Sequence, residues 1–288
     1  MSIFGSICDG LTRVRRTRSG FIQASAFHGS SLPKPGASAK SRAVQTVLLA
    51  MLALVAASGS ANSQETSEAV DPEAVAAVVA MGERLRALKS FSVEAEMSSD
   101  EVLESGEKLT HLEHVKADVK PPSGLRVARV STRRERIFFY DGERAVLWGP
   151  TTGYYTSISF NGKLKELIVT AAQKYNYEVP LADLFLWGSD EEDAKEIVAG
   201  NYVGTAMVGD RVCDHYAFRQ NNVDWQIWID KAEGGLPCRY SIIDLTDEAR
   251  PMFQATVRIK TGVAFDDARF QFVPPKDAVE IPFLTGDE

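Results

Sequence analysis

The stretch Val212–Leu245, with the sequence VCDHYAFRQNNVDWQIWIDKAEGGLPCRYSIIDL, contains three runs in which apolar and polar residues alternate. In the middle run, residues 223–230, the odd positions are Val, Trp, Ile and Ile, and the even positions are Asp, Gln, Trp and Asp. Asn221-Asn222 and Glu233-Gly234-Gly235 separate the runs as turns. A period of two in aromatic and β-branched residues predicts strands with one dry face and one wetter face. We therefore predict an antiparallel meander of two hairpins, around which the chain is organised.

The same alternation recurs on both sides of the meander and predicts about eleven strands in all. The expected strands outside the meander cover residues 91–97, 109–119, 125–130, 137–140, 145–148, 154–158, 202–208 and 253–260.

Two helical segments accompany these strands. Asp71 followed by Pro72 is a helix start, and apolar residues then recur at helical spacing up to about Lys89. In the middle of the chain, Leu164–Trp187 changes to a helical period, and its second part, Leu181–Trp187, is apolar on nearly all sides. A surface helix of two turns needs something to bury such a sequence. Leu181–Trp187 is interpreted as a helix that fills the core or as a lid over an apolar cavity. We expect both helical segments to cover the concave side of a curved sheet.

Residues 1–61 have the composition of a secretory signal peptide with a long basic leader. Seven Lys and Arg residues accompany a single acid, Asp9, and the apolar run Val47–Ala57 is followed by small residues up to Ala61. We predict cleavage after Ala61, with Ser63 as the alternative. A permanent span needs about 20 apolar residues, so an uncleaved membrane anchor is the lesser alternative. The expected protein is exported to the periplasm, has a flexible mature start at residues 62–70, and keeps no membrane span.

The charge balance of the mature chain argues against binding to nucleic acids and electrostatic docking on membranes. Of the 32 Lys and Arg residues 7 lie in residues 1–61, and of the 39 Asp and Glu residues 1 lies there, which leaves a formal charge of −13. This charge repels phosphate backbones and anionic lipid surfaces, so we expect no nucleic-acid partner. The remaining length suffices for one domain with a substantial core.

Cys213 and Cys238 are the two cysteines that follow the leader. In an oxidising compartment such a pair is able to form a disulfide. However, the two residues fall on the first and third strands of the meander, and next-but-one strands lie about 9–10 Å apart, beyond the roughly 7 Å limit between Cα atoms for a bridge. Strict alternation also places their side chains on opposite faces. We therefore predict two buried free thiols, with the disulfide as the alternative.

The order helix, strands, helical insert, strands resembles the LolA/LppX-like fold, and the local residues resemble one branch of it, a family of predicted periplasmic proteins. The residues that carry this resemblance are Tyr140-Asp141-Gly142, Pro180-Leu181-Ala182-Asp183-Leu184, Gly209 with Cys213-Asp214-His215, Asp224-Trp225-Gln226-Ile227-Trp228-Ile229, and Leu236-Pro237. The Asp224–Ile229 run is the most specific of them, and the resemblance extends over most of the mature chain, about Val70 to Phe283.

The resemblance implies an α+β, mainly β fold: an unclosed antiparallel half-barrel of about eleven strands, with an N-terminal helix and a mid-chain helical lid, over residues 71–283, followed by a tail at 284–288. It also implies a periplasmic location and an apolar cavity suited to acyl chains. It carries over no catalytic residue, and it does not make this protein a lipoprotein carrier.

Candidate catalytic groups are few. His111-Leu112-Glu113-His114 has a metal-binding spacing only on a helix, and on the strand predicted here positions three apart point to opposite faces. Asp224 and Asp230 share a face but lie roughly 20 Å apart along the strand, too far for acid–base partnership. The chain has no Gly-x-Ser-x-Gly elbow and no glycine-rich phosphate loop. We expect no catalytic site, no metal and no cofactor.

The function predicted from these features is non-covalent binding of a lipid, an acyl chain or a lipidated protein, for carriage or sensing. This prediction requires that side chains leave the hollow of the sheet partly unfilled. The alternatives are an envelope protein–protein interaction module that uses the exposed sheet edges, and a hydrolase with a dispersed site. The sequence assigns no oligomeric state. The predicted cavity wall consists of Phe139, Tyr155, Tyr216, Phe218, Trp225, Ile227 and Tyr240, and the predicted lid residues are Leu167, Leu184, Phe185 and Trp187.

Overall fold

The computed structural model describes residues 69–283 except 176, 187–191 and 233. All of these residues belong to one of the two compact units into which the chain divides. The predicted leader with its cleavage site at Ala61, most of the 62–70 segment, the predicted lid residue Trp187 and the tail at 284–288 lie outside the described residues.

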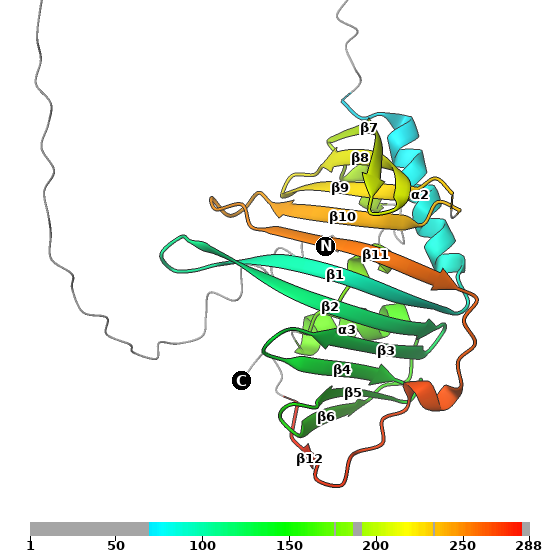
Figure 1. Cartoon of the computed structure of the whole chain (residues 1–288), viewed down its shortest axis with the longest axis vertical. Helices are drawn as coiled ribbons and strands as arrows, with labels where there is room; N and C mark the ends of the chain where they lie inside the picture. The colour runs from blue at the N-terminus through cyan, green and yellow to red at the C-terminus, as the bar shows by residue number, and fades with distance from the viewer. Residues whose placement is uncertain (1–68, 176, 187–191, 233, 284–288) are drawn as a thin grey trace, which may run out of the picture. The chain divides into compact units, whose positions relative to one another are not determined.

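The strands of the described residues form one twelve-stranded sheet in the order β12-β6-β5-β4-β3-β2-β1-β11-β10-β9-β8-β7 (Figure 1). Neighbouring strands are antiparallel except for β12 and β6, and the sheet stays unclosed because β12 and β7 stand at its two ends. The strands are β1 Phe91–Val102, β2 Lys108–Lys120, β3 Gly124–Val130, β4 Glu135–Tyr140, β5 Arg144–Gly149, β6 Tyr154–Ser159, β7 Ala199–Val208, β8 Arg211–Arg219, β9 Val223–Asp230, β10 Pro237–Asp244, β11 Met252–Thr261 and β12 Val279–Glu280.

The predicted unclosed antiparallel sheet is therefore confirmed, with all eleven expected strands in place. The twelfth strand, β12, has only two residues and carries no readable alternation. The central pairing is between β1 and β11, where Val93 lies opposite Ile259 and Ala95 opposite Val257. It joins the strands before the helical insert to the strands after it.

The helices cover one face of the sheet, which we call the inner face. They are α2 Pro72–Ala87, α3 Leu164–Tyr175 and α4 Ala182–Leu186, and the short α5 Glu192–Lys195 follows them in the chain. Asp71 caps α2 as predicted, because its Oδ1 accepts a hydrogen bond of 2.9 Å from the backbone N–H of Glu73. In Figure 1, α2 and α3 lie behind the strands, and buried residues of both helices belong to the same apolar core as the inner face of the sheet.

The alternation read in the meander is confirmed by the register. Trp225 of β9 lies opposite Phe218 of β8 and Ile242 of β10, and all three side chains are buried in the inner-face core. The rings of Phe218 and Trp225 stack with centroids 4.3 Å apart. Cross-strand pairs of this kind fix the register, because a slip by one residue would turn every apolar side chain outward.

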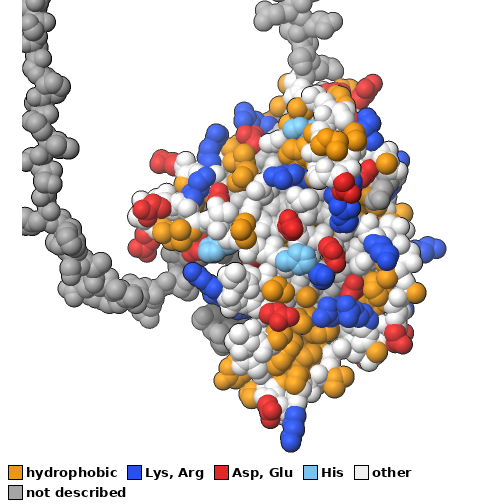
Figure 2. Space-filling model, in the orientation of Figure 1, with side chains coloured by type: hydrophobic (Ala, Val, Ile, Leu, Met, Phe, Trp, Pro, Cys, Tyr) orange, Lys and Arg blue, Asp and Glu red, His pale blue; other side chains and the backbone are white. Residues whose placement is uncertain are grey.

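The opposite face of the sheet, the outer face, is partly covered by the C-terminal segment. After β11 the chain forms the 3₁₀ helix η2, Asp267–Phe270, packed near β3, and then places Phe272 against a group of aromatic rings. Phe139 of β4 and Tyr155 of β6 lie in this group, 5.4 and 5.1 Å from the Phe272 ring. Their assignment to the cavity wall was therefore wrong. Phe138 and Tyr140 are the inward residues of β4, and Phe272 explains why Phe139 is apolar as well. Figure 2 shows hydrophobic side chains gathered over this lower part of the sheet.

The prediction of two free thiols is also wrong, because Cys213 and Cys238 form a disulfide with Cα atoms 6.9 Å apart. The pairing of β9 with β10 shifts register between Pro237 and Arg239, so Cys238 occupies a β-bulge. A bulge interrupts the alternation of side chains. Both sulfur atoms consequently lie on the outer face, in a small cluster with Val208 and Trp228.

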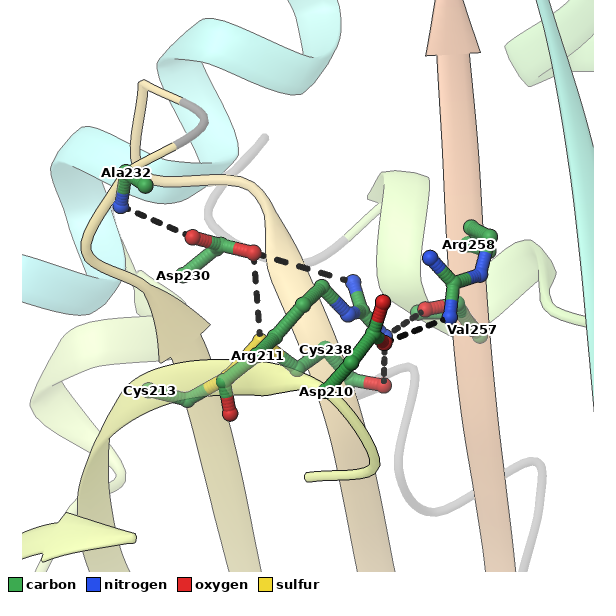
Figure 3. A network of polar contacts seen from close by, with 8 residues as sticks. All are labelled: Asp210, Arg211, Cys213, Asp230, Ala232, Cys238, Val257 and Arg258. Atoms are coloured by element: carbon green, nitrogen blue, oxygen red, sulfur yellow. Dashed lines mark hydrogen bonds and ion pairs between the residues drawn. A yellow bond between two sulfur atoms is a disulfide. The ribbon is translucent and has the colours of Figure 1, made fainter. Parts of the chain in front are cut away.

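A buried arginine reinforces the outer face beside this disulfide (Figure 3). Arg211 Nη2 donates to the carbonyl of Val257 on β11 at 2.6 Å and to that of Cys238 on β10 at 3.3 Å. Its Nη1 lies 3.9 Å from Oδ2 of Asp230 on β9, and that carboxylate also accepts a bond of 2.8 Å from the N–H of Ala232. A single side chain of β8 therefore contacts three further strands. We infer that the disulfide and Arg211 together hold this end of the meander.

Replacing both cysteines, in Cys213→Ala/Cys238→Ala, should lower the free energy of unfolding by about 3 kcal/mol, because the bridge closes a loop between residues 25 apart. Urea unfolding measures this difference. A reductant should destabilise the wild type by a similar amount and leave the double variant unchanged. Alkylation of both cysteines in denatured, unreduced protein would contradict the assignment.

Candidate functional site

Five of the seven predicted wall residues lie on the inner face of the sheet. Tyr216 is half-buried, and the other four are almost fully buried, with exposed fractions of 4% for Phe218, 5% for Trp225, 2% for Ile227 and 5% for Tyr240. They share one core with Ala74, Val78, Met81 and Leu85 of α2. The part of the hollow that the meander lines is therefore filled by side chains.

A cleft of about 480 Å³ lies away from all of the predicted site residues. It sits at the start of α2, where Val70 pairs with Gly200 of β7, and it is lined by Ala69, Val70, Pro72, Val75 and Ala194. These small and mostly aliphatic side chains bring no titratable group to the cleft.

The insert lies over the inner face and is held at the start of α3. Tyr140 Oη donates to the carbonyl of Gly162 at 2.6 Å and accepts from the N–H of the same residue at 3.1 Å. The N–H of Leu164 donates to the carbonyl of Pro122 at 3.0 Å. The predicted lid residue Leu167 is buried in the core one turn later. Burial raises the pKa of Tyr140, so its hydroxyl stays protonated and remains a donor at neutral pH.

The other described lid residues lie on α4. Leu184 is buried in the core, and the half-buried Phe185 stacks on Phe91 of β1 with ring centroids 5.3 Å apart. The structure therefore brings Leu167, Leu184 and Phe185 together over the inner face. The contact between Phe185 and Phe91 is purely apolar, so it resists displacement by another apolar group only weakly.

Half-buried apolar side chains gather where the insert meets the inner face of the sheet, from Phe91 of β1 to Ile158 of β6. These residues pack against the core but keep part of their surface accessible: Leu147, Ile158, Phe160, Leu164, Ile168, Tyr177, Ala182 and Phe185. We call this set the insert cluster. It contrasts with the meander, where most inner-face residues are almost fully buried.

A polar atom beside the insert cluster has no partner. Thr156 lies on the inner face of β6, opposite Leu147 of β5, and is 8% exposed. Its Oγ1 is buried and makes no hydrogen bond. Burying an unsatisfied hydroxyl costs about 1–3 kcal/mol. Thr156 therefore stabilises the fold less than an apolar residue of the same shape would at this position.

One end of the insert cluster carries arginines. Tyr177, just after α3, stacks on Phe138 of β4 with centroids 5.4 Å apart. Burial raises the pKa of Tyr177 to about 12, although the charges of Arg129 and Arg136 act to lower it. Arg129 of β3 lies directly opposite Arg136 of β4 in the register. Arg129 follows the inward residue Val127 by two positions and Arg136 precedes the inward residue Phe138 by two, so both arginines lie on the inner face. Arg129 is paired with Glu113 of β2, at 2.6 Å from Nε to Oε2.

A second polar group lies near the β7 edge of the inner face. The carboxylate of Asp214 accepts hydrogen bonds of 2.8 Å from Lys231 Nζ and 2.9 Å from Tyr202 Oη. Burial works to raise the pKa of Asp214, but the hydrogen bonds from Lys231 and Tyr202 outweigh it and hold the pKa below its ordinary value. Asp214 is therefore ionised near neutral pH and already occupied by its partners.

His111 and the group around the disulfide are further candidates with possible chemistry. His111 Nε2 lies 2.7 Å from a carboxylate oxygen of Glu101, on strand β2 as predicted. Cys213, Asp230 and Cys238 bring their potential ligand atoms within 4.8 Å of one another. Because the two sulfurs are joined, they offer no thiolate to a metal ion in this form.

The site residues predicted from the sequence do not include Arg129, Arg136, Tyr177 or Thr156. A signal for the arginines was present, because Arg129 continues the alternation of Leu125 and Val127, and Arg136 that of Phe138 and Tyr140. A charged residue in the period of an apolar face marks a polar point on that face. Tyr177 follows a helix end and had no periodic signal.

Comparison with known structures finds distant likenesses. LppX from Mycobacterium tuberculosis is 12% identical, with a TM-score of 0.34, and the match covers 65% of this chain and 94% of LppX. LprF from Mycobacterium bovis is 12% identical, with a TM-score of 0.40, over 73% of this chain and 99% of LprF. The LolA superfamily protein NE2245 from Nitrosomonas europaea is 10% identical, with a TM-score of 0.31, over 69% of this chain and 97% of NE2245. A search of curated protein sequences finds no match.

The family assignment comes from the sequence. Residues 74–284 match the family described as predicted periplasmic protein, DUF2092. This match confirms the predicted family resemblance and the periplasmic location. Among the described residues, no helix has the length and apolar character needed to cross a membrane. The chain belongs to the DUF2092 family of predicted periplasmic proteins.

Proposed function

We propose that this protein binds an apolar chain reversibly, as a lipid, a free acyl chain or the acyl group of a lipidated protein, and does so without catalysis. The observation that carries the proposal is the insert cluster. Half-buried apolar side chains converge there on the inner face of a curved sheet, under two helices that follow one another in the chain. Concave, mostly apolar sites with a few polar groups are typical of small-molecule binding.

The site proposed here differs from the predicted wall. The meander residues are packed against the core and leave little surface for a ligand. A chain is better accommodated between the insert and the inner face, where its methylene groups replace contacts that Phe185 now makes with β1 and Tyr177 with β4. The bound chain covers the apolar surface of the sheet in place of those side chains, and the free energy lost by exposing them lowers the net affinity.

The magnitudes support reversible binding. Burying a dozen methylene groups gains roughly 10 kcal/mol at about 0.8 kcal/mol each. Association and ordering cost about 4–15 kcal/mol, and displacing part of the insert adds to that cost. The net affinity suits a carrier or a sensor better than a permanent store. The hydroxyl of Thr156, which has no partner, can donate a hydrogen bond to an ester or carboxyl oxygen of the ligand.

A second candidate function is recognition of an envelope protein through the free edge of the sheet. Beyond the isolated bridge between Val70 and Gly200, β7 is an edge strand, and it exposes Tyr202 at 47%, Val203 at 55% and Met207 at 65%. Edge strands with apolar side chains can accept a further strand from a partner. Binding of an apolar chain is favoured because the insert cluster is larger and is enclosed on two sides.

A substitution on α3 tests the site. Ile168→Asn should weaken the binding of a fluorescent fatty acid about tenfold, because it places an amide within the apolar contact. Val169→Asn is the matched control, since Val169 is also half-buried on α3 but does not pack against the core. Fluorescence titration measures both affinities, and urea unfolding checks that both variants remain folded. Equal affinities for the two variants would argue against this site.

A second substitution tests whether the insert opens as a unit. Tyr140→Phe removes the two hydrogen bonds to Gly162 and should lower the free energy of unfolding by about 1–2 kcal/mol. It should also speed hydrogen exchange of α3 amides more than that of β9 amides. Tyr154→Phe is the control, because Tyr154 is 49% exposed. Uniform acceleration over helix and sheet would show that α3 opens only with the whole domain.

A further inference from the structure

Two arginines oppose each other on the inner face, at the end of the insert cluster where α3 finishes. Arg129 and Arg136 are direct register partners on β3 and β4. Side chains in such pairs have Cβ atoms about 4.5–5.5 Å apart, and like charges in this position destabilise a sheet. An anion placed between the two guanidinium groups would remove that repulsion.

Among the residues that the structure describes, an acid pairs with only one of the two arginines. Glu113 accepts from Arg129 through a single oxygen, Oε2, at 2.6 Å from Nε and 2.5 Å from Nη2. The side chain of Arg136 is exposed and makes no hydrogen bond or ion pair with any other residue that the structure describes. The chain carries 39 Asp and Glu against 32 Lys and Arg, so an acid partner is easily supplied elsewhere on its surface. An unpaired cation on an acidic protein, beside an apolar cluster, is therefore suited to an external anion.

The aromatic pair beside the arginines connects this cation to the apolar cluster. Phe138 follows Arg136 by two positions on the same face of β4, about 7 Å along the strand. Tyr177 stacks on Phe138 and belongs to the insert cluster. Because Tyr177 lies on Phe138, the inward neighbour of Arg136 on β4, the three side chains lie over the same part of the inner face. With its pKa raised to about 12 by burial, Tyr177 remains a hydrogen-bond donor at neutral pH.

We propose that Arg136, with Arg129 and the hydroxyl of Tyr177, forms a subsite for the anionic head of the bound amphiphile, a carboxylate or a phosphate whose apolar chain lies under the insert. This subsite rests on the proposed function and names the class of its ligand. Guanidinium groups match both kinds of head, because they donate two parallel hydrogen bonds to paired oxygens. The phenol of Tyr177 donates a third.

The test compares ligands that differ only in the head. A fluorescent hexadecanoic acid and the corresponding fluorescent hexadecanol are titrated into the exported protein at low ionic strength, and a fluorescent phosphatidic acid is compared with its diacylglycerol. The wild type should bind one or both anionic ligands about fivefold more tightly than the neutral partner, the strength of a partly exposed ion pair. The preferred pair identifies the head as carboxylate or phosphate. Added salt should reduce the preference.

The variants assign the preference to one residue. Arg136→Ala should weaken binding of the anionic ligand about fivefold and leave the neutral ligand unchanged, which separates the subsite from any loss of fold. Arg133→Ala is the matched control, because Arg133 is an exposed arginine in the loop before β4 that carries the same charge. It should keep the preference. Acetate and inorganic phosphate should not displace the anionic ligand, since they lack the chain.

Four results would overturn the subsite. Equal affinity for charged and neutral ligands in the wild type, or a preference that survives in Arg136→Ala, removes the subsite and leaves the proposed chain binding intact. Displacement by acetate or phosphate alone would show an anion site unconnected to the chain. Failure of both charged and neutral ligands to bind would refute the proposed function and the subsite with it.

Discussion

The apolar inner face of an unclosed sheet is the constraint on which the rest of the structure depends. Strands β1 and β11 pair at its centre and join segments that lie more than 150 residues apart in the chain, so that both halves of the sheet present apolar side chains to one side. A closed barrel would bury such a face within itself, whereas this sheet needs helices to exclude water. Helix α2 covers the meander, and the insert covers β5 and β6 less completely, since Leu147 and Ile158 stay half-buried. That difference locates the proposed binding site.

Most of the fold could be predicted from periodicity. The alternation in residues 223–230 correctly gave the inward set of β9, and Asp71-Pro72 correctly gave the start of α2. These features are local, because they follow from the side-chain period of a strand and from the capping of a helix. The covering of the inner face by helices follows from the same patterns together with the family resemblance. β12 was missed, since its two residues are placed by tertiary contacts with β6 and carry no pattern.

The errors share a physical origin, which is that alternation assumes regular strands and one apolar face. The bulge at Cys238 turns that side chain to the outer face and brings it within reach of Cys213. Phe139 and Tyr155 are apolar because Phe272 of the C-terminal segment covers them on the outer face. Neither the bulge nor the path of that segment has a local signature. The pairing of Arg129 with Arg136 likewise became visible only when the register of β3 and β4 was known.

Native mass spectrometry of the protein, isolated gently from the periplasm, tests the central claim most directly. The claim is that the insert and the inner face together hold one apolar chain. The expected spectrum shows one lipid or acyl-bearing molecule per protein, released when the solution is warmed or mixed with organic solvent. A spectrum of bare protein, or of protein with a stoichiometric polypeptide and no lipid, would contradict the account.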